Sequence, residues 1–128
     1  MPLAPLLESS AMPVGAFTCY DATTAAGVAE AAEQHAAHAI LLVSEASLAQ
    51  PSGRFLITAL LAVAERSASP ICVQLDHATD NALIASALAA GVGRMLDDGT
   101  TMTSDQHLTF VRQIFCQAHT AGQGEAYA

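Results

Sequence analysis

An aspartate and a histidine are adjacent in the sequence, between an apolar run and the predicted start of a helix. Asp76 and His77 directly follow the apolar residues 71–75 and precede Thr79 and Asp80, either of which can cap a helix. A neutral imidazole can ligate a metal while a neighbouring carboxylate, free of the metal, hydrogen-bonds or protonates a reacting oxygen. The residues alone leave a structural interpretation open, in which Asp76 caps the helix and His77 is simply exposed.

The elements that would position this pair alternate along the chain. Short, continuous apolar runs are typical of buried parallel strands, and the segments between them have helical spacing. The predicted strands are residues 14–19, 39–43, 71–75 and 92–96. The predicted helices are residues 21–34, the segment after Gly53, residues 79–91 and residues 103–122, with residues 124–128 as the opening of a fifth strand.

A regular alternation of strands and helices fits an open doubly wound sheet or part of a closed barrel. Neither GxGxxG nor GxxxxGK[ST] occurs in the sequence, which removes the two common phosphate-binding loops. A full barrel needs about 250 residues, and the chain has 128. We therefore expect an α/β fold, a partial (β/α)8 TIM barrel of about four βα units, in a single domain over residues 1–128. In such a barrel Asp76 and His77 lie at the catalytic edge.

Composition excludes several classes of function. The net charge is −8, and Lys and Arg gather nowhere with aromatic residues, so we expect no nucleic-acid partner. The apolar runs are too short to span a membrane, and no basic cluster precedes an apolar stretch at the N-terminus. We expect a soluble, cytoplasmic protein whose three scattered cysteines are structural thiols. His35 and His38 have a spacing that could hold a metal, although a helix end also suits an imidazolium.

The segment Leu75-Asp76-His77-Ala78-Thr79-Asp80, followed in order by Ala90-Gly91-Val92 and Asp98-Gly99-Thr100, resembles class II fructose- and tagatose-bisphosphate aldolases. The resemblance covers nearly the whole chain, as the N-terminal half of that family. It implies a zinc-dependent, reversible aldol cleavage of a ketose bisphosphate, which is a phosphorylated sugar substrate, to dihydroxyacetone phosphate and an aldehyde.

The resemblance also implies roles for individual residues. Asp76 matches the catalytic carboxylate that acts on the aldehyde oxygen, and His77 matches the first zinc ligand. Asp98 matches an acidic residue of the metal site. Ser44 and Thr100 match substrate-binding positions, although a serine at a strand end is also a common helix cap.

Departures from the family pattern favour an alternative. Thr18 stands where the family has Asn, Arg94 lies in a predicted buried strand, and Tyr127 occupies the position of a glutamate associated with metal binding. The chain also stops before the family's two later zinc-binding histidines. The alternative function is a truncated, catalytically inactive paralogue that acts as an assembly partner. In either case an incomplete barrel exposes strand edges, so we expect self-association.

Overall fold

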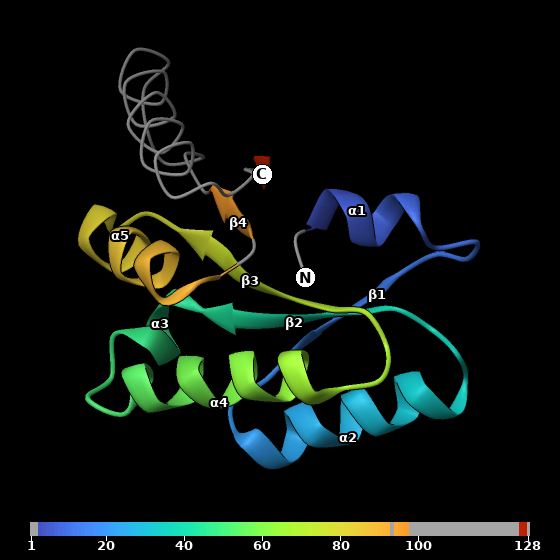
Figure 1. The fold of residues 1–128 in the computed structure, drawn as a ribbon. Helices are drawn as coiled ribbons and strands as arrows, with labels where there is room; N and C mark the ends of the chain where they lie inside the picture. Colours follow the sequence, from blue (N-terminus) through green and yellow to red (C-terminus); the bar gives the residue numbers. More distant parts are fainter. Residues whose placement is uncertain (1–2, 93, 98–125, 128) are drawn as a thin grey trace.

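A parallel sheet organises the chain in the computed structural model, which describes residues 3–92, 94–97 and 126–127. The strands follow one another in chain order, β1-β2-β3-β4-β5, and every pair of neighbours is parallel (Figure 1). Their bounds are β1 Gly15–Thr18, β2 Ala39–Ser44, β3 Ile71–Ala78, β4 Arg94–Asp97 and β5 Ala126–Tyr127. This sequential order is that of a barrel wall, and it rules out the permuted order of a doubly wound sheet.

Three helices cover one face of this sheet. They are α2 Ala22–Gln34, α4 Gly53–Arg66 and α5 Asn81–Ala90, and α2 and α4 lie side by side (Figure 1). Because side chains alternate along a strand, Leu41 and Val43 of β2 point to the same face as Val73 and Leu75 of β3. These four side chains form one apolar cluster with buried residues of the three helices, so this cluster is the main core.

Local sequence signals set the ends of these helices. The side chain of Asp21 caps α2 by accepting from the N–H of Thr24, and Asp80 caps α5. Gly91 ends α5 with φ +102°, a left-handed conformation that glycine adopts without steric cost. The prediction that this helix begins near Thr79 or Asp80 is confirmed, with Asp80 as the capping residue, and so is its predicted stop at Gly91.

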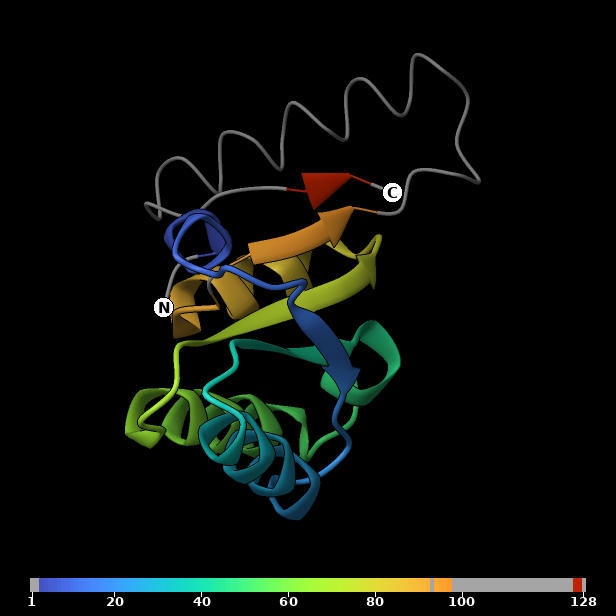
Figure 2. The same cartoon turned by 90° about the vertical axis from the view of Figure 1, so that its right-hand side faces the viewer.

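Two helices were not predicted from the sequence, α1 Leu3–Glu8 and α3 Glu45–Leu48. Helix α1 lies across the sheet from α2 and α4 (Figure 2). Its Leu6 is fully buried against Ile40 and Cys72, which face away from the main core. The Nδ1 atom of His38 donates to the backbone oxygen of Leu6 at 2.9 Å. His38 therefore helps to hold α1 on the second face of the sheet.

The expectation of a buried first strand is wrong for most of β1. Its residues Ala16, Phe17 and Thr18 are exposed, and Phe17 keeps 47% of its surface accessible. The reason is the position of β1 at the end of the sheet, where β2 is its only neighbouring strand among the described residues. The next residue, Cys19, is fully buried, and burial raises the pKa of its thiol, with a further contribution from the nearby charge of Asp21.

Some predicted elements lie partly or wholly outside the described residues. The predicted helix 103–122 is outside them, and so are Asp98 and Thr100. Of the predicted fifth strand, Ala126–Tyr127 is described, and it pairs with β4. Within the described part of the chain, no helix is long and apolar enough to cross a bilayer.

Glu33 ties the end of α2 to the segment that leads from α4 into β3. Its Oε1 atom accepts from the backbone N–H of Ala68 and from the hydroxyl of Ser67, each at 2.8 Å. These two donors, with the N–H of Ala68 the stronger, hold the pKa of Glu33 below its ordinary value of 4.5. The N–H and hydroxyl of Thr24 lower the pKa of Asp21 in the same way.

This arrangement predicts acid sensitivity. Because the folded-state pKa of Glu33 lies below the unfolded value, its stabilisation is complete above pH 4.5 and is lost as the pH falls through the folded-state value. Urea unfolding of the wild type and Glu33→Gln across this range measures the effect. We expect the difference in free energy of unfolding between them to shrink on acidification. A difference that is constant or grows toward low pH would contradict this assignment.

Candidate functional site

The carboxyl end of β3 carries an irregularity at the two residues of interest. Leu75 pairs with Met95 and Ala78 with Asp97, so β3 has one residue more than β4 between these pairs. Asp76 and His77 lie in this bulge, and His77 has φ +47°, in the left-handed region. Bulges re-aim side chains and often occur beside active sites. The backbone therefore turns the Asp-His pair out of the regular strand pattern.

The two side chains lie close together with different exposure. The Nε2 atom of His77 is 3.6 Å from Oδ1 of Asp76, and the exposed fractions of the side chains are 53% for His77 and 25% for Asp76. An accessible imidazole can ligate an ion, and a half-buried carboxylate can exchange a proton with a bound molecule. The pair thus has the geometry to divide these two tasks.

Ser44 lies beside Asp76 at the same edge, because the two residues pair in register between β2 and β3. Its hydroxyl is used locally: Oγ accepts from the N–H of Ser47 at 3.1 Å and donates to the hydroxyl of Ser47 at 2.9 Å. Ser44 is thus the N-cap of α3. The structure brings Ser44 to the strand end and shows its side chain in the capping role.

Asp76 does not cap the following helix. That position belongs to Asp80, whose Oδ1 atom accepts from the N–H groups of Ala82 at 2.8 Å and Leu83 at 3.2 Å. The structural interpretation of Asp76 as a helix cap is therefore wrong. Its carboxylate lies at the carboxyl edge of the sheet and has no capping role there.

Glu45, which directly follows Ser44, was missed by the sequence analysis. Its carboxylate accepts from the backbone N–H groups of Thr79 and Asp80 and from the hydroxyl of Thr79. It therefore connects the end of β2 to the segment that follows His77. The available signal was an acidic residue beside the serine at the end of the second strand, but its partners lie 34 and 35 residues away.

The described residues provide only part of a zinc-binding site. Catalytic zinc usually has three protein ligands, and the described residues contain no group of three His, Cys, Asp or Glu side chains that could hold a metal. His77 is a suitable donor by type and exposure. The described residues by themselves therefore do not fit a catalytic zinc ion, and further ligands would have to join His77.

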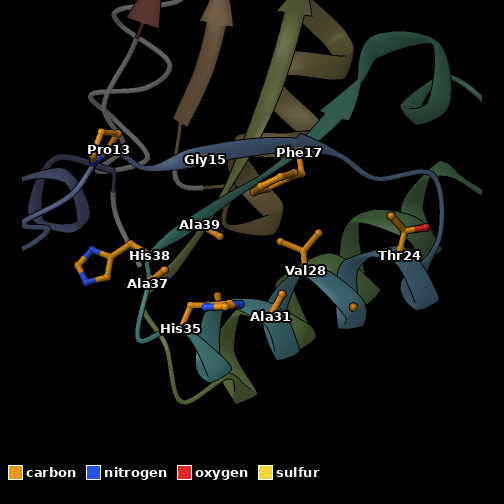
Figure 3. A pocket seen from close by; sticks show the side chains of 12 residues that line it. Pro13, Gly15, Phe17, Thr24, Val28, Ala31, His35, Ala37, His38 and Ala39 are labelled. Carbon is orange, nitrogen blue, oxygen red and sulfur yellow. The ribbon is translucent and has the colours of Figure 1, made fainter.

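An apolar groove of about 550 Å³ lies elsewhere, between β1 and α2 (Figure 3). Phe17 projects from β1 toward Val28 of α2, and His35 lies near one end of the groove. Phe17 is in register with Leu41, so it points to the face of the sheet that the helices cover. Asp76 and His77 do not line this groove, and it is therefore separate from the candidate site.

The sheet and the site together define a class of protein. Sequential parallel strands, helices on the outer face and polar residues at the carboxyl edge are the features of a (β/α)-barrel wall. Residues 7–124 match the family described as class-II fructose-bisphosphate aldolase. The chain belongs to that family.

Individual relatives agree with this assignment. The chain is 27% identical over 109 residues to a fructose-bisphosphate aldolase of Thermus caldophilus. The aligned region covers 85% of this chain and 35% of the relative. A crystal structure described as a fructose-1,6-biphosphate aldolase from Coccidioides immitis superposes with a TM-score of 0.88 at 20% identity, over 97% of this chain and 45% of that one.

The YdjI aldolase of Escherichia coli K12 superposes with a TM-score of 0.81 at 17% identity, over 89% of this chain and 43% of that one. At such identities the two solved structures show the fold, and they confirm the expected partial barrel. The chain thus spans less than half the length of each of these relatives.

Proposed function

We propose that this chain supplies the first part of a zinc-dependent ketose-bisphosphate aldolase site, with Asp76 as its catalytic carboxylate. The observation that supports it best is the half-buried carboxylate of Asp76 beside the exposed imidazole of His77, at the carboxyl edge of a barrel-type sheet. The substrate class is a phosphorylated sugar, by analogy with the fructose-bisphosphate aldolase of Thermus caldophilus. Fructose 1,6-bisphosphate is therefore the first substrate to test.

In this proposal Asp76 moves the proton at the oxygen of the future aldehyde. During cleavage the carboxylate takes the hydroxyl proton, the carbon–carbon bond breaks, and the electron pair of that bond stays with the dihydroxyacetone phosphate half. In the reverse direction Asp76 returns the proton to the aldehyde oxygen. The partial burial of Asp76 limits the contact of its carboxylate with bulk water.

His77 is proposed as one zinc ligand, and Asp98 as a further residue of the metal site. Zinc in such enzymes supplies Lewis-acid polarisation of a carbonyl. Ser44 and Thr100 are proposed to contact substrate, Ser44 through its position beside Asp76. Asp98 and Thr100 lie outside the described residues.

The proposal is tested with a chimeric protein in which the barrel is complete. Joining this chain to the unmatched remainder of the Thermus caldophilus relative would add the part of that aldolase that this chain does not match, and we expect that part to complete the barrel. We expect that chimera to cleave fructose 1,6-bisphosphate and to lose the activity on addition of a chelator. A folded chimera that binds zinc but shows no cleavage would favour the alternative, in which the chain is an inactive paralogue acting as an assembly partner.

We also propose that the 128-residue chain self-associates and shows no aldol cleavage alone, even with added zinc. The terminal strand β1 and the apolar groove beside it present exposed backbone and the 47% exposed ring of Phe17, which a second copy could cover. Light scattering coupled to size exclusion measures the assembly. We expect Phe17→Thr to shift the chain toward monomer.

Phe55 provides the matched control, since it is 62% exposed but lies on α4 and does not line the groove. Phe55→Gln should leave the assembly at the wild-type size. A compact monomer for the wild type, or cleavage of a ketose bisphosphate by the chain alone, would contradict the proposal.

A further inference from the structure

Glu45 connects two strand ends at the candidate site. It is the first residue of α3 and follows Ser44, which pairs in register with Asp76. Its Oε2 atom accepts from the backbone N–H of Thr79 and from that of Asp80, the latter at 3.3 Å, and its Oε1 atom accepts from the hydroxyl of Thr79 at 3.3 Å. Both carboxylate oxygens therefore hold the segment that leaves the bulge.

The conformation of His77 requires such a hold. The φ of +47° at His77 is sterically unfavourable for a residue with a side chain, so the surroundings must impose it. Ala78, which directly follows His77, is fixed by its pairing with Asp97 and by complete burial. The backbone N–H groups of the next two residues, Thr79 and Asp80, are fixed by the carboxylate of Glu45. The backbone after His77 is thus held both by β4 and by Glu45.

Capping of α5 does not account for these contacts. In the first turn of that helix, the N–H groups of Ala82 and Leu83 already donate to the side chain of Asp80. The amides that Glu45 holds come before them in the chain, next to the bulge. The contacts of Glu45 therefore act on the strand end that carries Asp76 and His77.

We propose that Glu45 is a positioning residue for Asp76 and His77: its carboxylate holds the Thr79 and Asp80 amides and thereby keeps His77 in its left-handed, outward orientation. The functional part of this assignment rests on the proposed aldolase-type site. Replacing a residue that orients a metal ligand, without itself binding the metal, typically lowers metal affinity about 10- to 100-fold. Glu45 would act in this way through the backbone rather than through the imidazole.

The experiment uses the full chain and three variants, two of which make the same Glu-to-Gln change at different places. Glu45→Gln removes the charge and half of the accepting capacity at the site edge. Glu33→Gln is the matched control, because Glu33 also accepts from a backbone N–H and a hydroxyl about 35 residues along the chain, but where α4 leads into the start of β3. Glu45→Ala removes the carboxylate altogether. Amide hydrogen exchange and NMR spectra of His77 are recorded for each, with and without Zn²⁺.

Without metal, we expect both Glu45 variants to speed exchange at Thr79 and Asp80 and to shift the backbone signals of His77, with the larger effect for alanine. Glu33→Gln should leave these signals unchanged and speed exchange at Ala68 instead. On zinc titration, the response of the His77 imidazole should need about tenfold more Zn²⁺ in Glu45→Gln than in the wild type. The control should titrate as the wild type does.

Unchanged exchange and unchanged His77 signals in Glu45→Ala would overturn the proposal. So would faster exchange at Thr79 and Asp80 with wild-type His77 signals and wild-type zinc response, since Glu45 would then only brace a loop. If the wild type itself shows no zinc response at His77, the zinc role in the proposed function fails. The metal-free signals of His77 still decide whether Glu45 positions it.

Discussion

Replacing Asp76 by Asn in the completed barrel is expected to lower kcat/KM for cleavage of fructose 1,6-bisphosphate by about 10²- to 10⁴-fold, the usual contribution of a general acid–base group. Asparagine keeps the shape of the side chain but cannot take up the hydroxyl proton. The main loss should appear in kcat, because proton transfer belongs to the chemical step rather than to substrate binding. Steady-state kinetics of the chimera measures both parameters.

Asp80 offers a matched control at the same strand end. It is exposed, lies four residues further along, and caps α5 through its side chain. Asn caps helices about as well as Asp, so Asp80→Asn should preserve the fold and stay close to wild-type kcat. Equal losses in the two variants would mean that the carboxylates act on stability or local charge, and Asp76 would lose its catalytic assignment.

Replacing Leu75 by Ala is expected to lower the free energy of unfolding by about 2–5 kcal/mol, as for other buried leucines. Leu75 is fully buried in the main core, on the central strand β3, directly before Asp76. The substitution removes packing against the helices and leaves a cavity that rigid strands fill poorly. Urea unfolding at fixed protein concentration measures the change, with the denaturant slope reported beside it.

Leu7→Ala is the control for this experiment. Leu7 is 47% exposed on α1, so its truncation should change the free energy of unfolding by no more than about 0.5 kcal/mol. A cost below about 1 kcal/mol for Leu75→Ala would mean that the core is looser than its burial indicates. The packing between the sheet and its helices would then need revision.

The sequence was sufficient for the elements whose signals are local. Continuous apolar runs indicated the parallel strands, and Asp80 and Gly91 marked the ends of α5. It also placed Asp76 and His77 at the carboxyl edge of β3, since they follow an apolar run and precede a helix cap. Each of these inferences depends on neighbours within a few residues.

Features that depend on distant partners were missed. Helix α1 has six residues, fewer than two helical turns, so its sequence shows no repeating apolar pattern. It is held by the burial of Leu6 and the hydrogen bond from His38. The bulge at His77 depends on the register with β4 and on Glu45 of α3, neither of which leaves a local pattern. The exposure of β1 follows from its place at the end of the sheet, which its composition does not reveal.

Zinc titration of the 128-residue chain, followed through its histidine side chains by NMR, tests the central claim most directly. His77 is exposed beside a carboxylate at the candidate site, whereas His35 and His38 lie by the separate groove near β1. We predict weak, saturable binding in which His77 responds at the lowest zinc concentration and His77→Gln abolishes that response. Uniform broadening of all histidines, or first response at His35 and His38 with His77 unaffected, would contradict the assignment of the site to the end of β3.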